Sequence, residues 1–190
     1  MFKKSLLAVV TSALFSVIAF NASADDQGHG IVTFSGTVIT APCSVDEDST
    51  QIDVDLGQVA DTVLNGGKYS DSADFSIHLK DCILTGTDGE GNPTVIDKVN
   101  VTFTSANVDS TDASLMANTR ENSYGGATGV GVRILDAGYN TVDLGVALPV
   151  AFTSANPTQN LDFHARMESL GKNATVGDVY AQANYVLSYQ

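Results

Sequence analysis

Residues able to act as acids, bases, nucleophiles or metal ligands are spread thinly along the sequence. The three histidines, His29, His78 and His164, lie far apart, and each stands in an alternating run opposite its apolar neighbours. This placement predicts solvent-facing side chains. The sequence contains no HExxH, GxSxG or P-loop pattern. We therefore expect no enzyme activity, no cofactor and no metal site.

Two loops have a composition typical of ligand binding but lack what each chemistry requires. Asp88–Asn92 (DGEGN) places oxygen ligands at alternate positions, yet it lacks the full ligand set and the distal glutamate of a calcium loop. Gly125–Gly131 (GGATGVG) is rich in glycine, but it fits no dinucleotide fingerprint and opens no helix. We interpret the first as an ordinary turn and the second as a loop that enters a strand.

The amino-terminal residues have the order of a secretory signal peptide. Lys3 and Lys4 form a basic start, Leu6–Phe20 is an apolar run of the right length, and Ala22–Ala24 is a small-residue cleavage site. Removing these 24 residues from the 190 leaves 166, which is enough for one exported domain with a core. No later segment approaches the ~20 apolar residues that a membrane-spanning helix needs.

The charge balance excludes one class of partner. With 9 Lys and Arg against 22 Asp and Glu, the formal net charge is −13, and it becomes −15 when Lys3 and Lys4 leave with the signal peptide. Because such a surface repels phosphate backbones, we expect no nucleic-acid binding. The acidic residues are scattered in twos and threes, which favours an ordinary solubilising surface over an acidic tail.

Cys43 and Cys82 are the two cysteines of the sequence. An even count in an exported chain favours a disulfide, since neither CxxC spacing nor a nearby histidine supports a metal or redox pair. The two residues are 39 positions apart. Closing a loop of that length contributes about 4 kcal/mol in the chain-entropy description of disulfide stabilisation.

Short alternating runs of apolar residues follow one another after the signal peptide and predict strands. The runs are Ile31–Val38, Gln51–Leu56, Phe75–Leu79, Val95–Phe103, Gly129–Leu135, Leu144–Phe152, Leu161–Met167 and Tyr180–Tyr189. Gly, Asn, Asp and Ser separate them, and strands at this spacing predict an all-β sandwich in one domain. Asp112–Ala117 is the segment for which we expect a single helical turn.

Both ends of the exported chain are predicted strands. Gly28–Val38 (GHGIVTFSGTV) starts within a few residues of the expected cleavage site, and it has glycine gaps on the side that carries Val32 and Phe34. The last strand ends flush with the chain. One of its faces carries three large side chains, Tyr185, Leu187 and Tyr189.

The order of these features resembles the pilins of chaperone–usher fimbriae, most closely the type 1 major-subunit group. The resemblance spans essentially the whole chain and includes the signal peptide, the single cysteine pair and the penultimate tyrosine. Its motifs are IVTFSGTV (Ile31–Val38), APCSV (Ala41–Val45), LGQV (Leu56–Val59), FSIHLKDC (Phe75–Cys82), GVGVRILD (Gly129–Asp136), FHAR (Phe163–Arg166) and the terminal Tyr189–Gln190.

This resemblance implies an incomplete immunoglobulin-like β-sandwich, the pilin fold, over residues 37–190. The fold lacks its last strand, so a hydrophobic groove with an unpaired backbone edge would lie beside the C-terminal strand. In the family, a periplasmic chaperone lends a strand to this groove. At the outer-membrane usher, the N-terminal extension of another subunit replaces that strand by donor-strand exchange. The implied product is a surface fimbrium that supports cell adhesion, built from copies of this subunit and other fimbrial subunits.

The resemblance also implies roles for particular residues. The donor strand would lie within residues 25–36, and its groove-facing positions would be Gly28, Gly30, Val32 and Phe34. The acceptor groove, flanked on one side by the region after Cys43, would use Tyr185, Leu187, Tyr189 and Gln190 of the C-terminal strand. Basic residues of the chaperone would hold the Gln190 carboxylate during transit.

The sequence is compatible with two roles for this chain in the fimbria. The chain is either the repeated shaft subunit or a minor adaptor or adhesive subunit with a carbohydrate or protein receptor. A tip adhesin places a lectin domain ahead of the pilin domain, and 166 residues leave no room for one, which favours the shaft. The acidic loop Leu84–Asp97 departs from the family pattern, and we expect it to change an exposed surface without changing assembly.

Overall fold

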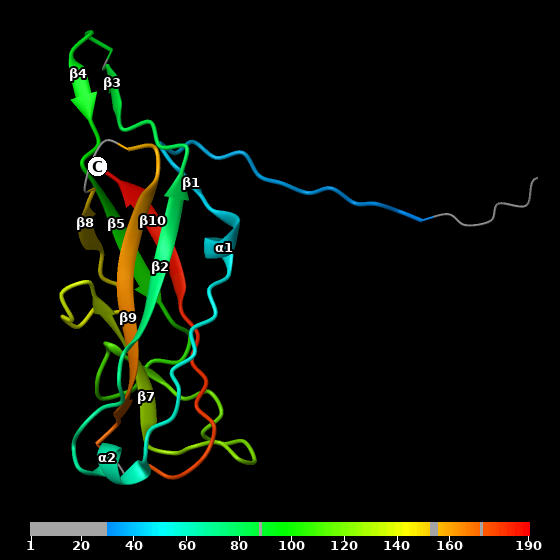
Figure 1. Ribbon diagram of the computed structural model, residues 1–190, viewed down its shortest axis with the longest axis vertical. Helices are drawn as coiled ribbons and strands as arrows, with labels where there is room; N and C mark the ends of the chain where they lie inside the picture. The colour runs from blue at the N-terminus through cyan, green and yellow to red at the C-terminus, as the bar shows by residue number, and fades with distance from the viewer. Residues whose placement is uncertain (1–29, 88, 153–155, 172) are drawn as a thin grey trace, which may run out of the picture. The chain divides into compact units, whose positions relative to one another are not determined.

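The computed structural model describes residues 30–87, 89–152, 156–171 and 173–190 and divides the chain into two units at Val38. In the described part of the first unit, Gly30–Val38, no residue belongs to a helix or strand (Figure 1). The predicted strand Ile31–Val38 is therefore absent from the single chain, because a strand forms only where a partner accepts its ladder of hydrogen bonds. The signal peptide, Gly28 and His29 lie outside the described residues.

The second unit, Ile39–Gln190, is built from antiparallel strands. A five-stranded sheet holds, in spatial order, β1 (Ser44–Val45), β2 (Ala73–Lys80), β9 (Gln159–Ser169), β7 (Val130–Asp136) and β6 (Leu115–Ala117). A three-stranded sheet holds β10 (Asn184–Tyr189), β5 (Lys98–Thr104) and β8 (Leu148–Ala151). β3 (Thr85–Thr87) pairs with β4 (Pro93–Val95), and two short helices, α1 (Glu47–Thr50) and α2 (Asp61–Asn65), complete the unit (Figure 1).

Alternate side chains from the two larger sheets meet in one core. Ile77 and Leu79 of β2 are fully buried, as are Val99 and Val101 of β5. The ring of Phe103 from β5 meets that of Phe163 from β9 edge to face, with centroids 5.0 Å apart. Two antiparallel sheets that share a core in this way form a β-sandwich, so the predicted all-β sandwich is confirmed.

The disulfide between Cys43 and Cys82 is also confirmed, and both cysteines are buried. It joins the residue before β1 to the segment just after β2 and so reinforces the β1–β2 pairing. Two backbone hydrogen bonds hold the same region, from Ile83 N to Pro42 O and from Cys82 N to Pro157 O. The start of the second unit is thereby fixed to its interior.

Most predicted strands form, with shifted ends, but Gln51–Leu56 does not. Ile52, Val54 and Leu56 are half-buried and alternate with exposed residues, as the pattern predicted, yet the segment belongs to no sheet. The alternation reports which side chains touch the core, whereas a strand also requires a neighbouring backbone. No strand in the described part of the chain pairs with this segment.

The helical turn expected over Asp112–Ala117 is wrong. Leu115–Ala117 is the strand β6, paired with β7, and Leu115 and Met116 are buried. The preceding residues form turns because the Asp112 carboxylate accepts a hydrogen bond from the Ser114 N–H at 3.0 Å. Such local bonds from aspartate compete with helix formation.

The loop Leu84–Asp97 contains the β3–β4 hairpin, in which Thr85 pairs with Val95 and Thr87 with Pro93. Its strand residues are exposed, so it does add an exposed surface. Gly89 and Glu90 lie in a turn, and Gly91 follows with a φ of 86°. Asp88 lies outside the described residues.

Candidate functional site

The last strand, β10, has one free edge. It pairs with β5 along its whole length, from Asn184 opposite Thr104 to Tyr189 opposite Val99. It is the terminal strand of its sheet, and across the described ranges no strand pairs with its other side. Its outward N–H and C=O groups therefore form an edge onto which another strand could add.

The core-facing side of β10 carries the three large side chains that the sequence singled out. Tyr185, Leu187 and Tyr189 are half-buried and pack against the core. Val186, between them, points the other way and is 61% exposed. Burial raises the pKa of the Tyr185 and Tyr189 phenols above the ordinary tyrosine value. Three large side chains beside the free edge thus stay partly exposed to solvent.

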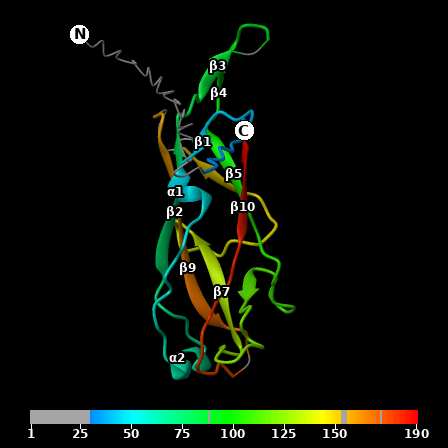
Figure 2. The same cartoon turned by 90° about the vertical axis from the view of Figure 1, so that its right-hand side faces the viewer.

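A second line of half-buried side chains lies in Gln51–Leu56. Ile52, Val54 and Leu56 pack against the same core as Leu187, and their backbone also lacks a ladder. Figure 2 shows this segment, in cyan, and β10, in red, running along the same side of the second unit. The core is therefore bordered by the unpaired edge of β10 and by Gln51–Leu56, and no strand within the described residues lies between these two segments.

One hydrogen bond connects β10 to α1, the helix just before Gln51–Leu56. The Tyr185 hydroxyl donates to the main-chain carbonyl of Ser49 in α1 over 2.6 Å. Ser49 is fully buried, and its own hydroxyl accepts from the His78 N–H of β2 at 2.8 Å. The α1 turn is thus fixed to the larger sheet, and Tyr185 fixes β10 to α1.

The predicted donor residues lie in the first unit. Val32 and Phe34 are 74% and 91% exposed, which is unusual for side chains of this size and polarity. A Cβ placed on Gly30 would meet nothing within 4 Å, so no contact in the single chain requires glycine there. Their roles, like those of Tyr185, Leu187, Tyr189 and Gln190, stay predictions.

The histidines differ in their surroundings. His78 is exposed on β2, as predicted, and its Nδ1 lies 2.9 Å from Asn160 Oδ1. His164 faces away from the core, but it is half-buried because the Tyr139 ring stacks on it. In the part of the chain that the structure describes, no group of three or more His, Cys, Asp or Glu residues is arranged to hold a metal ion. No helix among those residues is long and apolar enough to cross a membrane.

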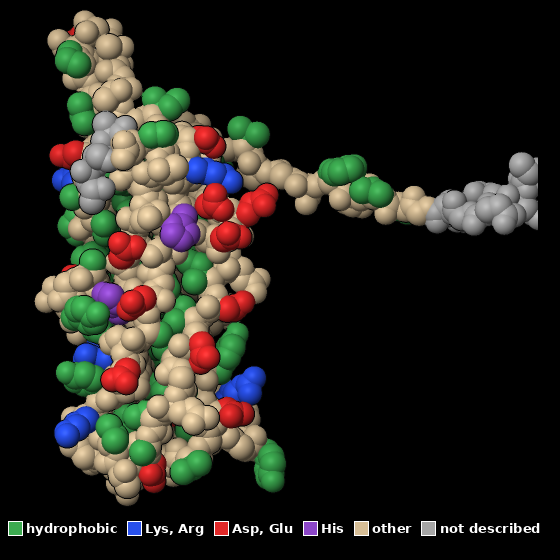
Figure 3. All heavy atoms as spheres, viewed as in Figure 1, with side chains coloured by type: hydrophobic (Ala, Val, Ile, Leu, Met, Phe, Trp, Pro, Cys, Tyr) green, Lys and Arg blue, Asp and Glu red, His purple; other side chains and the backbone are tan. Residues whose placement is uncertain are grey.

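Sequence reasoning missed a cluster on the outer face of β9. Arg166 lies over the Tyr69 ring, 3.6 Å from its centroid, and pairs with Glu168 at 2.7 Å. Glu168 also pairs with Arg133 of β7 at 2.8 Å. The alternation in Leu161–Met167 could have placed Arg166 on the outer face, but nothing in the sequence indicated that Tyr69 would reach it. Figure 3 shows acidic side chains spread over the face in view, in keeping with their scatter along the sequence.

Comparison with known proteins shows that the chain is similar to fimbrial proteins along most of its length. A sequence model of the fimbrial protein family matches residues 32–190. The chain is 47% identical to the fimbrial-like protein YgiL of Escherichia coli, over 100% of this chain and 98% of that one. It is 36% identical to the type-1 fimbrial protein A chain of Escherichia coli, over 98% of both chains.

A solved structure of a chaperone–usher pilus contains a similar subunit. That subunit is 30% identical, superposes with a TM-score of 0.67, and the match covers 86% of this chain and 97% of the other. The fold predicted from the resemblance, an immunoglobulin-like pilin sandwich, agrees with this likeness. The fimbrial protein family consists of structural pilins of surface fimbriae, not of enzymes. The chain belongs to the fimbrial protein family, as a subunit of chaperone–usher pili.

Proposed function

We propose that the chain is the repeated shaft subunit of its fimbria and that it polymerises by donor-strand exchange at the free edge of β10. The observation that carries this proposal is that, among the described residues, β10 has one unpaired edge and Gln51–Leu56 pairs with no strand, while side chains of both pack against the core. A strand laid beside β10 would accept and donate its outward hydrogen bonds. It would also cover Leu187 and the apolar side chains of the opposite border.

The N-terminal segment has the composition that such a strand needs. Gly30, Val32 and Phe34 fall on one face of an extended chain, since side chains alternate along a strand. Burying Val32 and Phe34 would contribute roughly 1.5–3 kcal/mol each. Each ladder hydrogen bond would add about 0.5–1.5 kcal/mol. A strand of this kind becomes part of its neighbour's fold and leaves only as fast as that fold opens.

Because donor and acceptor occupy different parts of the chain, each subunit would offer a strand to one neighbour and a groove to another. Such contacts are heterologous, and they produce a filament when the rotation between subunits does not close. This accounts for a fibre built from one kind of subunit without any covalent chemistry.

Before assembly, the free edge has to be covered. An unpaired edge beside half-buried tyrosines and leucine would aggregate. We propose that a periplasmic chaperone lends a strand to β10 and holds the Gln190 carboxylate through basic side chains. At the outer-membrane usher, the donor strand of the next subunit would replace it, and the fibre would reach the cell surface.

The donor assignment is tested by charge substitution on the two faces of the N-terminal segment. Replacing Val32 and Phe34 by Asp should abolish fibres, because a buried carboxylate without a partner is strongly unfavourable. The matched control replaces Ile31 and Thr33, on the opposite face, by Asp. Electron microscopy and the ladder of multimers on unheated detergent gels measure the outcome. Fibres from the Val32 and Phe34 variant would refute the donor assignment.

The shaft assignment is tested separately by deleting the gene for this chain alone. A shaft subunit is the main material of the fibre, so we expect cells without it to carry no fibres under the electron microscope. Normal fibres on those cells would show that the chain is an accessory subunit, the alternative that the sequence left open.

A further inference from the structure

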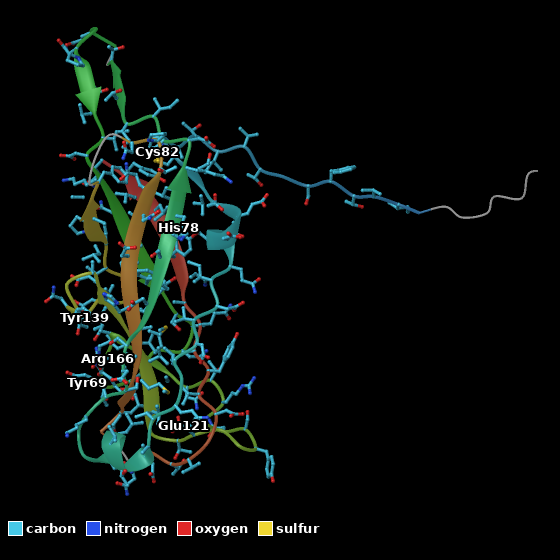
Figure 4. The ribbon with its side chains drawn as sticks, in the orientation of Figure 1. Tyr69, His78, Cys82, Glu121, Tyr139 and Arg166 are labelled. Atoms are coloured by element: carbon cyan, nitrogen blue, oxygen red, sulfur yellow. A yellow bond between two sulfur atoms is a disulfide. The ribbon has the colours of Figure 1, made fainter. Side chains whose placement is uncertain are left out.

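A hollow on the outer face of the larger sheet lies away from the edge of β10. It has a volume of about 540 Å³ and is lined by Tyr69, Ser70, Asp71, Ser72, Tyr139 and Arg166. Arg166 and His164 of β9 alternate with the buried Ala165 and Met167, so they point away from the core. Figure 4 shows Tyr139, Arg166 and Tyr69 one below another along the sheet, with Arg166 between the two tyrosines.

Tyr139 is held with its ring in a fixed position. Its φ of 62° lies in the left-handed region, which a bulky side chain adopts rarely and only where its surroundings enforce it. The Asp136 carboxylate holds the turn by accepting hydrogen bonds from the N–H groups of Gly138 and Asn140. One face of the ring stacks on His164, with centroids 4.0 Å apart and 7° between planes. The residue is nevertheless 58% exposed and lines the hollow, so its side chain is accessible to a ligand.

Tyr69 forms the second aromatic wall. It is 55% exposed, and the guanidinium of Arg166 covers one side of its ring. Arg166 is itself held by Glu168, which Arg133 holds in turn. Both rings are therefore pre-oriented by neighbours that are themselves paired, and a ligand would bind them without first ordering the side chains.

The charges and the backbone around the hollow narrow the class of ligand. The charge of Arg166 is balanced by Glu168, and Asp71 adds a carboxylate at the rim. In a chain with a net charge of −13, this disfavours an anion. An extended peptide is disfavoured too, because β9 lies between β2 and β7 and has no free edge to extend.

We propose that this hollow binds a neutral oligosaccharide. A hexopyranose ring would lay its apolar C–H face on the exposed ring of Tyr139, while its hydroxyl groups would donate to Asp71 and bond to Ser72 at the rim. The proposal does not rest on donor-strand exchange, because the hollow is on the side of the larger sheet that faces away from the core. It would give the chain a receptor-binding surface whether it forms the shaft or an accessory position.

The test measures binding by the purified mature chain, as fibres or as a chaperone complex, so that its result is independent of polymerisation. Saturation-transfer NMR would be run with methyl glycosides of galactose, glucose, mannose and N-acetylglucosamine, and with neutral oligosaccharides that contain them. N-acetylneuraminic acid serves as the anionic comparison. We expect transfer to at least one neutral sugar, with little change between low and moderate salt.

The key variant is Tyr139→Asn, since asparagine tolerates the left-handed backbone while the aromatic platform is lost. It should weaken binding at least tenfold, and Tyr69→Leu provides a second variant should the first fail to fold. The control is Tyr124→Ala, which removes a fully exposed tyrosine outside the hollow and should leave affinity unchanged. No transfer to any neutral sugar, a preference for the anionic sugar, or unchanged affinity in the folded variants would each overturn the proposal.

Discussion

The hydroxyl of Tyr185 lies 2.6 Å from the main-chain carbonyl oxygen of Ser49, and this hydrogen bond joins β10 to α1, the helix just before Gln51–Leu56. Its geometry matches a short O–H···O bond. Because Ser49 is anchored to β2 through the His78 N–H, the bond relates the position of β10 to that of the larger sheet. It therefore holds β10 near the start of Gln51–Leu56.

Tyr185→Phe should loosen this connection without removing the ring from the core. The loss of one hydrogen bond costs about 0.5–1.5 kcal/mol, which lowers Tm by about 2–4 °C for each kcal/mol in a chain of this size. Thermal unfolding of the purified mature chain in complex with its chaperone measures the shift. Tyr124→Phe is the control, because its phenol is fully exposed. Equal melting temperatures for the Tyr185 variant and the unmodified chain would mean that the bond contributes nothing to stability.

Leu187 and Val186 are neighbours on β10 that face opposite ways, which makes them a matched pair. Leu187→Ala should remove half-buried apolar surface and cost about 2 kcal/mol or less. It should also lower the temperature at which multimers dissociate on detergent gels, since we propose that a donor strand covers this side chain. Val186→Ala truncates a residue that is 61% exposed and should change stability by less than about 0.5 kcal/mol. Similar dissociation temperatures for the two variants would contradict the assignment of the core-facing side of β10.

The alternating runs predicted the strands well where two such runs pair with each other. Phe75–Leu79 and Leu161–Met167 lie in β2 and β9, which pair with Phe75 opposite Phe163. The same reasoning failed at Gln51–Leu56, where alternate side chains contact the core although no ladder forms. A sequence pattern records burial but not the presence of a partner strand. The unpaired segment is also the one that borders the candidate site.

The outer-face hollow could not be predicted from the sequence, for a different reason. Its rings and charges come from three separate stretches: the segment before β2, the turn after β7, and β9. The β2–β9 register, with Phe75 opposite Phe163, places Tyr69 near Arg166, and the β7–β9 register, with Asp136 opposite Phe163, places the turn that carries Tyr139. Such a constellation has no spacing rule along the chain. By contrast, the disulfide followed from the cysteine count, and the alternation of the last strand placed Tyr185, Leu187 and Tyr189 on one face.

The ion pair between Asp112 and Arg133 predicts how stability changes in acid. A hydrogen bond from Arg133, 2.6 Å long, is the main cause that lowers the pKa of Asp112 from 3.8 to about 2. A depressed pKa in the folded state stabilises the fold above the unfolded value, and this contribution is lost as the pH falls from about 4 towards 2. The Tm of the unmodified chain should decline across that interval.

Asp112→Asn should flatten this decline, because the variant has no carboxylate to protonate at the site. The relevant quantity is the difference in Tm between variant and unmodified chain, measured from pH 5 to pH 2, since other acidic groups titrate in both. The difference should shrink as the pH falls. Asp53→Asn, an exposed carboxylate in Gln51–Leu56, is the control. A difference that stays constant with pH would refute the role assigned to the ion pair.

A substitution at Gly30 can distinguish an effect on the folding of the subunit from an effect on polymerisation. A Cβ on Gly30 would meet no atom within 4 Å, so Gly30→Leu should leave the folding of the subunit and its capture by the chaperone unchanged. In the proposed donor strand, however, this position faces the groove of the next subunit, where a leucine would overfill a shallow site. We expect the multimer ladder to disappear. Ser35→Leu adds the same side chain on the opposite face and should leave the ladder intact, which excludes a general effect of added hydrophobicity. A normal ladder from Gly30→Leu would show that glycine has no special place in the donor strand.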